Sequence, residues 1–323
     1  MQDDTAVIQA CIDEAQTRYG AEVYFPPRDA GQWYKITAPL VVTAPIKIRG
    51  AGPHAVTILA GSGALSSGEY LLDIDCDSAD NVEHLTIEGI TLRSADGTPN
   101  GIHIKDASYV RVVDVRTYGV ANGVDIEGSR CFSNKFDGLV CYGTTGTSVR
   151  FLANFTGGGQ FGFKDCTFTG AYGLTVDSTA VTDGMTIDGG NWEGCTTRAI
   201  KVQGTVQGLN LEGVRGEGGG GSGFEFAPVS GKEVTGLTIS GMSFYSGTVA
   251  SVPIILGTSG GSGGRVRGFA IVGNRVGYAA QDYFVELNAE AQTGVIMGNH
   301  FAETTTQVVS DMRLGVVVMA NEN

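Results

Sequence analysis

One short pattern recurs along this chain and constrains its fold more than any other feature. Segments of the form apolar-x-Gly-x-x-apolar return about every 25 residues. The clearest copies are TIEGITL (86–92), TIDGGNW (186–192), TISGMSF (238–244), AIVGNRV (270–276) and VIMGNHF (295–301). Self-similarity at this period is typical of solenoids and propellers rather than of an ordinary globular core.

The central residue of each copy, which we call the anchor, is glycine or aspartate. The anchors are Gly89, Asp114, Gly138, Asp165, Gly189, Gly213, Gly241, Gly273 and Gly298. These residue types suit a bend that needs positive φ, where most side chains clash. Gly50 offers an earlier anchor, followed by an insertion before Gly89.

Short strands surround each anchor, because apolar residues alternate there with period two. About ten residues after most anchors another strand is expected, as in GIHIKD (101–106), GVDIEG (123–128), SVRFLA (148–153), GLTVDS (173–178), AIKVQG (199–204) and GFEFAP (223–228). A propeller blade would need four strands in about 40–45 residues. The pattern therefore predicts an all-β protein: a single-stranded, right-handed parallel β-helix of about ten coils.

The chain opens with one predicted α-helix, residues 3–20, which begins with aspartate and ends at Gly20. Its apolar stripe is Val7, Cys11 and Ala15. We expect this helix to cap the open end of the β-helix, with residues 21–60 forming the first coil and 70–323 the other coils of one domain, 1–323. The last strand, 315–321, stops inside a coil, so we expect either a partner chain over the ends or a longer parent protein.

Charge and cysteine content exclude several classes of protein. The net charge of −13 argues against nucleic acid, whose phosphates would be repelled. The sequence has no transmembrane stretch, which argues against membrane insertion. The six cysteines show no metal-binding spacing, and we expect them to be reduced and to fill apolar positions of the coils.

The N-terminal region resembles the pectate-lyase-like β-helix superfamily. The segment DDTAVIQACIDEA, followed by AEVYFPP and YKIT, is similar to the family's helix and first strands over roughly residues 3–43. The family's Gly-Asp-Gly turn before Asp3 is absent, and PPRDAGQW (26–33) replaces its Pro-Gly. The resemblance implies a polysaccharide substrate, a phage tailspike type of depolymerase, a homotrimer, and an extracellular or virion-surface location. It also implies that the strand after the bend carries the polysaccharide groove.

Charged residues gather on the outer side of those strands. Side chains alternate between the faces of a strand, so His103 and Lys105 point outward when Ile102 and Ile104 point inward. The same alternation in successive coils predicts two outer ladders. The first contains Asp73, His103, Asp125, Arg150, Thr175, Lys201 and Glu225, and the second contains Asp75, Lys105, Glu127, Leu152, Asp177 and Gln203.

Two carboxylates in the first ladder suit glycoside hydrolysis. Asp73 and Asp125 lie two coils apart, roughly 10 Å by backbone. Side-chain reach brings their carboxyl groups into the ~6.5–9.5 Å window of an inverting glycosidase. We expect this pair to be catalytic, with Asp75 and Glu127 as the alternative pair and His103 tuning it. The residues expected to bind substrate are Lys105, Arg150, Lys201 and Glu225.

Other interpretations of the same face stay open. In a uronic-acid lyase or C5-epimerase, His103 or Lys105 would remove a proton and Arg150 would neutralise the uronate. Alternatively, the charges merely compensate one another in a non-catalytic, glycan-binding or structural β-helix. No cofactor is expected, although calcium could bind through Asp73, Asp75 and Asp125.

Two further groups of residues are weaker candidates. Aromatic residues that would either stack on sugars or pack in coils and turns are Trp33, Tyr34, Tyr118, Tyr142 and Trp192, the last of which is expected inside. An acidic strip on a different face, a second choice for a carboxylate pair, comprises Asp188, Glu193, Glu212 and Glu217.

Overall fold

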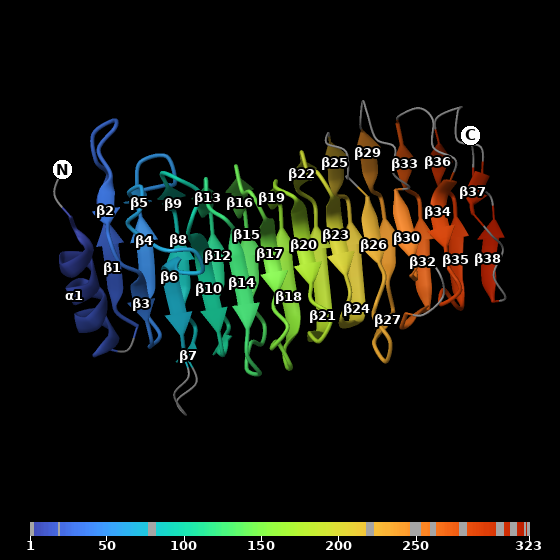
Figure 1. Ribbon diagram of the computed structural model, residues 1–323, viewed down its shortest axis with the longest axis horizontal. Coiled ribbons are helices and arrows are strands. Elements are labelled where there is room, and N and C mark those ends of the chain that lie inside the picture. The colour runs from blue at the N-terminus through green and yellow to red at the C-terminus, as the bar shows by residue number, and fades with distance from the viewer. Residues whose placement is uncertain are drawn as a thin grey trace.

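The chain folds into a β-helix of about ten coils built from parallel strands, with one helix at its N-terminal end (Figure 1). This computed structural model describes residues 3–18, 20–76, 82–217, 223–245, 253–258, 263–277, 283–301, 307–310, 315–319 and 321. Each coil contributes one strand to each of three long sheets, which we number by their order along the chain. The predicted fold class is therefore confirmed.

Sheet 1 holds the strands that precede the anchors. Its strands in spatial order are β1 (Glu22–Phe25), β4 (Lys47–Gly50), β8 (Thr86–Glu88), β12 (Arg111–Val113), β15 (Lys135–Asp137), β18 (Gly159–Lys164), β21 (Val181–Asp188), β24 (Thr205–Glu212), β28 (Thr238–Ser240), β32 (Phe269–Val272), β35 (Gly294–Met297) and β38 (Val316–Met319). Strands β27 (Glu233–Thr235) and β31 (Arg265–Arg267) join its side through β24.

Sheet 2 holds the strands that follow the anchors. Its strands are β2 (Tyr34–Ile36), β5 (Thr57–Ala60), β9 (Thr91–Ser94), β13 (Arg116–Tyr118), β16 (Val140–Tyr142), β19 (Thr167–Phe168), β22 (Asn191–Glu193), β25 (Arg215–Glu217), β29 (Ser243–Tyr245), β33 (Arg275–Val276) and β36 (His300–Phe301).

Sheet 3 completes each coil and carries the predicted ladders. Its strands are β3 (Leu40–Val42), β6 (Tyr70–Asp75), β10 (Asn100–Lys105), β14 (Val124–Glu127), β17 (Thr147–Phe151), β20 (Tyr172–Val176), β23 (Arg198–Val202), β26 (Phe224–Phe226), β30 (Ile254–Leu256), β34 (Tyr283–Leu287) and β37 (Gln307–Val309). A small separate pair is β7 (Val82–Glu83) with β11 (Ala107–Ser108).

The anchors form the bend between sheets 1 and 2. All nine have positive φ, and even the aspartates Asp114 and Asp165 adopt 48° and 50°. Gly50 is different: it lies in register beside Gly89 without positive φ, so it is no anchor in this sense. A Cβ on Gly50 would lie 2.3 Å from the Gly89 carbonyl oxygen, so close approach explains this glycine.

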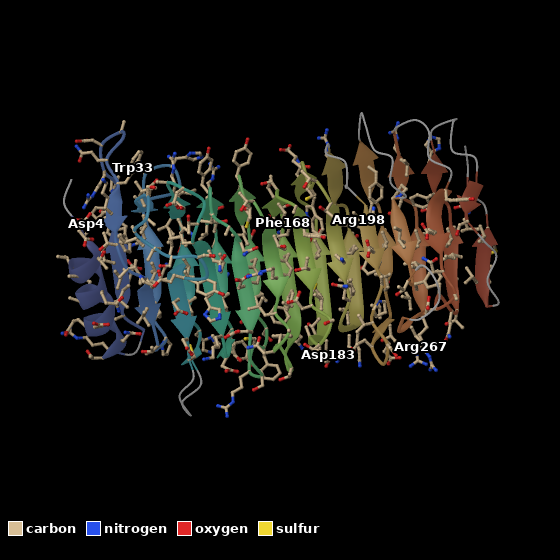
Figure 2. All side chains as sticks on the ribbon, in the orientation of Figure 1. Asp4, Trp33, Phe168, Asp183, Arg198 and Arg267 are labelled. Atoms are coloured by element: carbon tan, nitrogen blue, oxygen red, sulfur yellow. The ribbon has the colours of Figure 1, made fainter. Side chains whose placement is uncertain are left out.

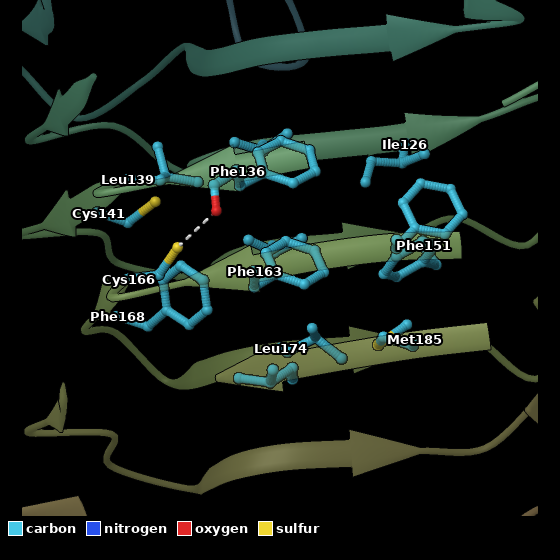
Figure 3. Packing of buried hydrophobic residues seen from close by; sticks show 14 of the residues in the cluster. Ile126, Phe136, Leu139, Cys141, Phe151, Phe163, Cys166, Phe168, Leu174 and Met185 are labelled. Carbon is cyan, nitrogen blue, oxygen red and sulfur yellow. Dashed lines mark hydrogen bonds between the residues drawn. The ribbon is translucent and has the colours of Figure 1, made fainter. Parts of the chain in front are cut away.

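Residues two positions before the anchors form one continuous interior ladder. In register they are Ile87, Val112, Phe136, Phe163, Ile187, Leu211, Ile239, Ile271 and Ile296. Each is at most 1% exposed. Phe136 and Phe163 stack with centroids 4.7 Å apart, and Phe168 packs edge-on against Phe163 (Figure 3).

The helix α1 (Thr5–Gln16) lies against strands β1 and β3 at the end of the solenoid (Figure 1). It is shorter than predicted, and its buried stripe is Ile8, Ile12 and Ala15, because Val7 is 65% exposed. Cys11 is likewise exposed, while the other five cysteines are buried and free. In the described part of the chain, no helix is long and apolar enough to cross a membrane.

Candidate functional site

The first predicted ladder is present in full on the outer face of sheet 3, and the second is present in its first three positions. In register along the sheet, the first is Asp73, His103, Asp125, Arg150, Thr175, Lys201 and Glu225. The second begins with Asp75, Lys105 and Glu127. Parallel pairing stacks these side chains at the inter-strand spacing of about 4.8 Å, which brings charged groups from four coils together.

His103 lies between two carboxylates. Its Nδ1 is 2.7 Å from Asp73 Oδ1, and its Nε2 is 3.2 Å from Glu127 Oε1. The second contact is close but not aligned as a hydrogen bond, so Nε2 has no hydrogen-bond partner among the described residues. Glu127 Oε2 also accepts a hydrogen bond from Asn154 Nδ2 at 2.8 Å. Burial lowers the pKa of His103, but the bond to Asp73 and the surrounding negative charge outweigh it, so its pKa is raised.

Tyr70 covers this histidine, and sequence reasoning missed it. Its ring stacks on His103 with centroids 4.4 Å apart and planes 9° apart. Its hydroxyl donates to Asp125 Oδ2 at 2.9 Å. Strict alternation places Tyr70 on the inward side with Leu72 and Ile74. Tyr70 is the first residue of β6, where the chain leaves the turn, so the alternation fails there.

Asp125 is enclosed rather than open to substrate. Arg150 donates to both of its oxygens, from Nε at 2.7 Å and from an Nη at 2.6 Å. The Asp125 side chain is 0% exposed, while that of Arg150 is 29% exposed. With the Tyr70 hydroxyl as a third donor, Asp125 binds protein groups on both oxygens. The structure thus brings Asp125 into the predicted cluster, but in a position that supports its neighbours.

Each carboxylate that we considered for calcium is engaged by a protein group. Asp75 accepts from Lys105 Nζ at 3.1 Å, Asp73 contacts His103, and Asp125 binds Arg150. Within the described ranges no group of three or more His, Cys, Asp or Glu residues has an arrangement that could hold a metal ion. The three carboxylates that were proposed as calcium ligands are therefore already paired with side chains of the protein.

Lys201 and Glu225 lie farther along the same sheet. Lys201 is three strands from Asp125, about 14 Å by backbone, so it does not join the histidine cluster. Its Nζ lies 5.7 Å from the Tyr172 ring centroid. Glu225 Oε2 accepts a hydrogen bond at 3.1 Å from Nε of Arg198, which Figure 2 labels. These residues extend a polar surface away from the cluster.

The predicted acidic strip is not one surface. Asp188 pairs with Glu212 on sheet 1, whereas Glu193 pairs with Glu217 on sheet 2. The anchors bend the chain between these residues, so the two pairs face different directions. The side chain of Glu217 falls outside the described residues. The prediction of a single strip was wrong, because it ignored the bend.

The aromatic candidates divide between interior and surface. Trp192 is 0% exposed, as predicted, and Tyr34 packs edge-on against Phe25. Tyr118 and Tyr142 are 41% and 52% exposed on sheet 2. Part of each of these two tyrosine side chains is therefore accessible to solvent.

The three-sheet solenoid, the bends formed by its positive-φ anchors and its capping helix define a right-handed parallel β-helix, the fold that the N-terminal resemblance implies. In sequence, the chain is similar to a polygalacturonase of Penicillium griseoroseum, 31% identical over 198 residues. That match covers 54% of this chain and 45% of the relative, so the chain spans less than half of the curated relative that it matches. No family model matches.

Solved structures share the fold over nearly the whole chain. One is PfbA, a surface adhesin of Streptococcus pneumoniae, with a TM-score of 0.75 and 13% identity, covering 99% of this chain and 86% of that one. Another is the A-module of the mannuronan C-5 epimerase AlgE6 of Azotobacter vinelandii, with a TM-score of 0.62 and 14% identity, covering 100% and 96%. At such identities the likeness concerns the fold alone.

Proposed function

We propose that this protein is a polysaccharide-degrading enzyme, a glycoside hydrolase that works on the outer face of sheet 3. The observation that carries the proposal is that Asp73 and Glu127 contact opposite nitrogens of one imidazole ring, His103. Their nearer oxygens are therefore at most about 8 Å apart, an upper bound that is compatible with the ~6.5–9.5 Å range of inverting glycosidases. This pair replaces Asp73 and Asp125, since Asp125 is enclosed by Arg150.

Asp73 acts as the base and Glu127 as the acid. Asp73 is the more exposed of the two, with 29% of its side chain accessible against 17% for Glu127. Asp73 takes a proton from a water molecule, whose oxygen forms the new bond to the anomeric carbon. The bond from that carbon to the glycosidic oxygen breaks, and Glu127 gives its proton to this leaving oxygen.

His103 holds the two carboxyl groups in place. Its Nδ1 is bonded to Asp73 Oδ1 and its Nε2 lies 3.2 Å from Glu127 Oε1, so the ring sets the separation of the pair. The raised pKa of His103 keeps the ring protonated closer to neutral pH than an ordinary histidine, and the protonated ring balances the charge of the Asp73 carboxylate. Between turnovers Asp73 releases its proton to solvent and Glu127 takes one from solvent.

Lyase or epimerase chemistry is the second candidate, and the contacts of Arg150 disfavour it. That chemistry needs a cation that neutralises the uronate carboxylate. Arg150 already donates two hydrogen bonds to Asp125, and Lys105 binds Asp75. Support for a polysaccharide substrate of either kind comes from the polygalacturonase relative and the epimerase neighbour.

The substrate, assembly and location follow the family resemblance. We propose a bacterial surface polysaccharide that runs along sheet 3 towards Lys201 and Glu225, where Arg198 and Tyr172 add polar and aromatic contacts. We further propose an extracellular or virion-surface protein that works as a homotrimer. The elongated, flat outer sheet suits a long chain that occupies several sugar subsites.

A substrate panel tests the proposal. The protein is incubated with bacterial capsular polysaccharides and with uronans, and reducing ends and ultraviolet absorbance are followed. Hydrolysis gives new reducing ends without the absorbance of an unsaturated uronate. A gain in absorbance would instead assign lyase chemistry. Glycan binding without either signal across the panel would overturn the enzymatic proposal in favour of an adhesin.

A further inference from the structure

A column of side chains on the outer face of sheet 2 contains an aromatic stack. Arg93, Tyr118 and Tyr142 are in register on successive strands. The two tyrosine rings stack with centroids 5.7 Å apart, and the Arg93 guanidinium lies 4.9 Å from the Tyr118 centroid. Arg93 and Tyr142 come from the coils on either side of Tyr118. Both faces of Tyr118 are thus covered, whereas one face of Tyr142 points to the next coil.

The next position of this column is occupied by a small residue. The register of β16, β19 and β22 places Thr169 beside Tyr142 and Glu193 beyond it. The Thr169 hydroxyl donates to the Cys141 carbonyl at 3.0 Å and accepts from the Gly143 amide at 3.1 Å. These bonds hold the short side chain against the strands. The column therefore has a gap between Tyr142 and Glu193.

That gap opens into a groove of about 600 Å³. Among the residues that line it are Tyr142, Thr144, Thr169, Ala171, Glu193 and Thr196. Tyr142 and Glu193 are separated by two strand spacings, about 10 Å. A ring placed midway is in van der Waals contact with the Tyr142 face, and its hydroxyl groups are within reach of the Glu193 carboxylate.

Two polar groups line the groove. Thr144 is 5% exposed, and its buried hydroxyl oxygen has no hydrogen-bond partner among the described residues. Buried polar groups are normally paired, so an occupant that reaches this hydroxyl after a turn of the Thr144 side chain gains a hydrogen bond. Glu193 Oε1 accepts from Asn191 Nδ2 at 2.6 Å, which fixes the orientation of the carboxylate.

We propose that this groove, the Tyr142 slot, binds one neutral pyranose residue of a polysaccharide. The apolar face of the sugar stacks on Tyr142, and its hydroxyl groups donate to Glu193. A uronate is disfavoured because its carboxylate would meet that of Glu193, and the cation Arg93 lies on the far side of Tyr118. The slot lies on sheet 2, so it holds the polysaccharide on a different face from the cluster on sheet 3 and raises its local concentration there.

Titration calorimetry on the full chain tests the slot. The probes are maltohexaose, β-1,4-galactohexaose and trigalacturonate. We expect a neutral hexaose to bind and Tyr142→Ala to weaken it about tenfold or more. Thr169→Leu, which fills the gap, should do the same. Tyr118→Ala is the matched control: it removes a neighbouring tyrosine, 41% exposed against 52% for Tyr142, whose two faces are already covered, and it should change the affinity only a few-fold.

Three outcomes would overturn the slot: no binding of either neutral hexaose, equal losses in Tyr142→Ala and Tyr118→Ala, or a preference for trigalacturonate through Tyr142. Asp73→Asn separates this inference from the proposed hydrolysis. Binding to the slot should survive that substitution unchanged. Loss of hydrolysis with intact binding leaves the slot standing, and loss of binding in Asp73→Asn would contradict a separate site.

Discussion

Arg150 and Asp125 form a closed pair in which two guanidinium nitrogens donate to the two carboxylate oxygens at 2.7 and 2.6 Å. Asp125 is fully buried. The pair links β14 to β17, and Asp125 also accepts a hydrogen bond from the Tyr70 hydroxyl. We expect removal of this ion pair to lower the stability of the fold more than it affects catalysis directly.

We predict that Arg150→Met destabilises the chain by about 3 kcal/mol, because it leaves a buried carboxylate without its partner. The double variant Asp125→Leu/Arg150→Met should recover most of the loss, since no uncompensated charge remains. Urea unfolding followed by circular dichroism measures both. A single variant as stable as the parent would mean that Asp125 gains little from Arg150.

The pH dependence of stability should follow His103. Its pKa is raised in the folded chain relative to about 6.5 in the unfolded chain. Its stabilising contribution is therefore fully present below pH ~6.5 and is lost as the pH rises through the raised value. As the pH rises through this window, the melting temperature of the parent should fall, and that of His103→Gln should fall less. A parent that becomes more stable in this window would refute the assignment.

The interior ladder gives a test of register. Ile239 is 0% exposed between Leu211 and Ile271. Ile239→Asp buries an unpaired charge and should cost several kcal/mol. The neighbour Thr238 points to the other face, so Thr238→Asp is the control and should change stability by less than about 1 kcal/mol. Equal melting of the two variants would show that the faces are misassigned.

Assembly is a separate prediction. The trimer that the tailspike resemblance implies would give a light-scattering mass three times that of one chain at micromolar concentration. The exposed side of α1 forms a groove of about 600 Å³ lined by Val7, Ala10 and Cys11, among others, a surface that a neighbouring subunit would cover. Val7→Glu should then weaken association. A clean monomer for the parent at that concentration would reject the trimer.

Sequence periodicity was enough to predict the coils, because two local rules set them. Positive φ at the anchors selects glycine or aspartate, and alternation places Ile87 or Ile239 inside. Parallel stacking of the coils then determines which outward residues become neighbours, so the ladders could be predicted from the sequence.

The parts that could not be predicted depend on geometry outside regular strands. Tyr70 escapes alternation at a strand end, and Asn154 reaches Glu127 from the segment after β17. The enclosure of Asp125 depends on the conformation of the Arg150 side chain, and the pattern of residues in the sequence does not predict that conformation. Ala15 of the α1 stripe was predicted correctly, but Val7 and Cys11 were predicted in place of Ile8 and Ile12, since both Val7 and Ile8 fit a helical repeat.

The most direct test of the account is the rate of reducing-end release by Glu127→Gln on a polysaccharide that the parent cleaves. Loss of a general acid commonly costs about 10²–10⁴ in rate, and Gln keeps the shape and the bond from Asn154. Glu212→Gln, an outward carboxylate on sheet 1, is the matched control. We predict a loss of at least about 10²-fold for Glu127→Gln, with unchanged melting and full activity in the control. A rate within a few-fold of the parent would contradict the claim that sheet 3 carries the catalytic pair.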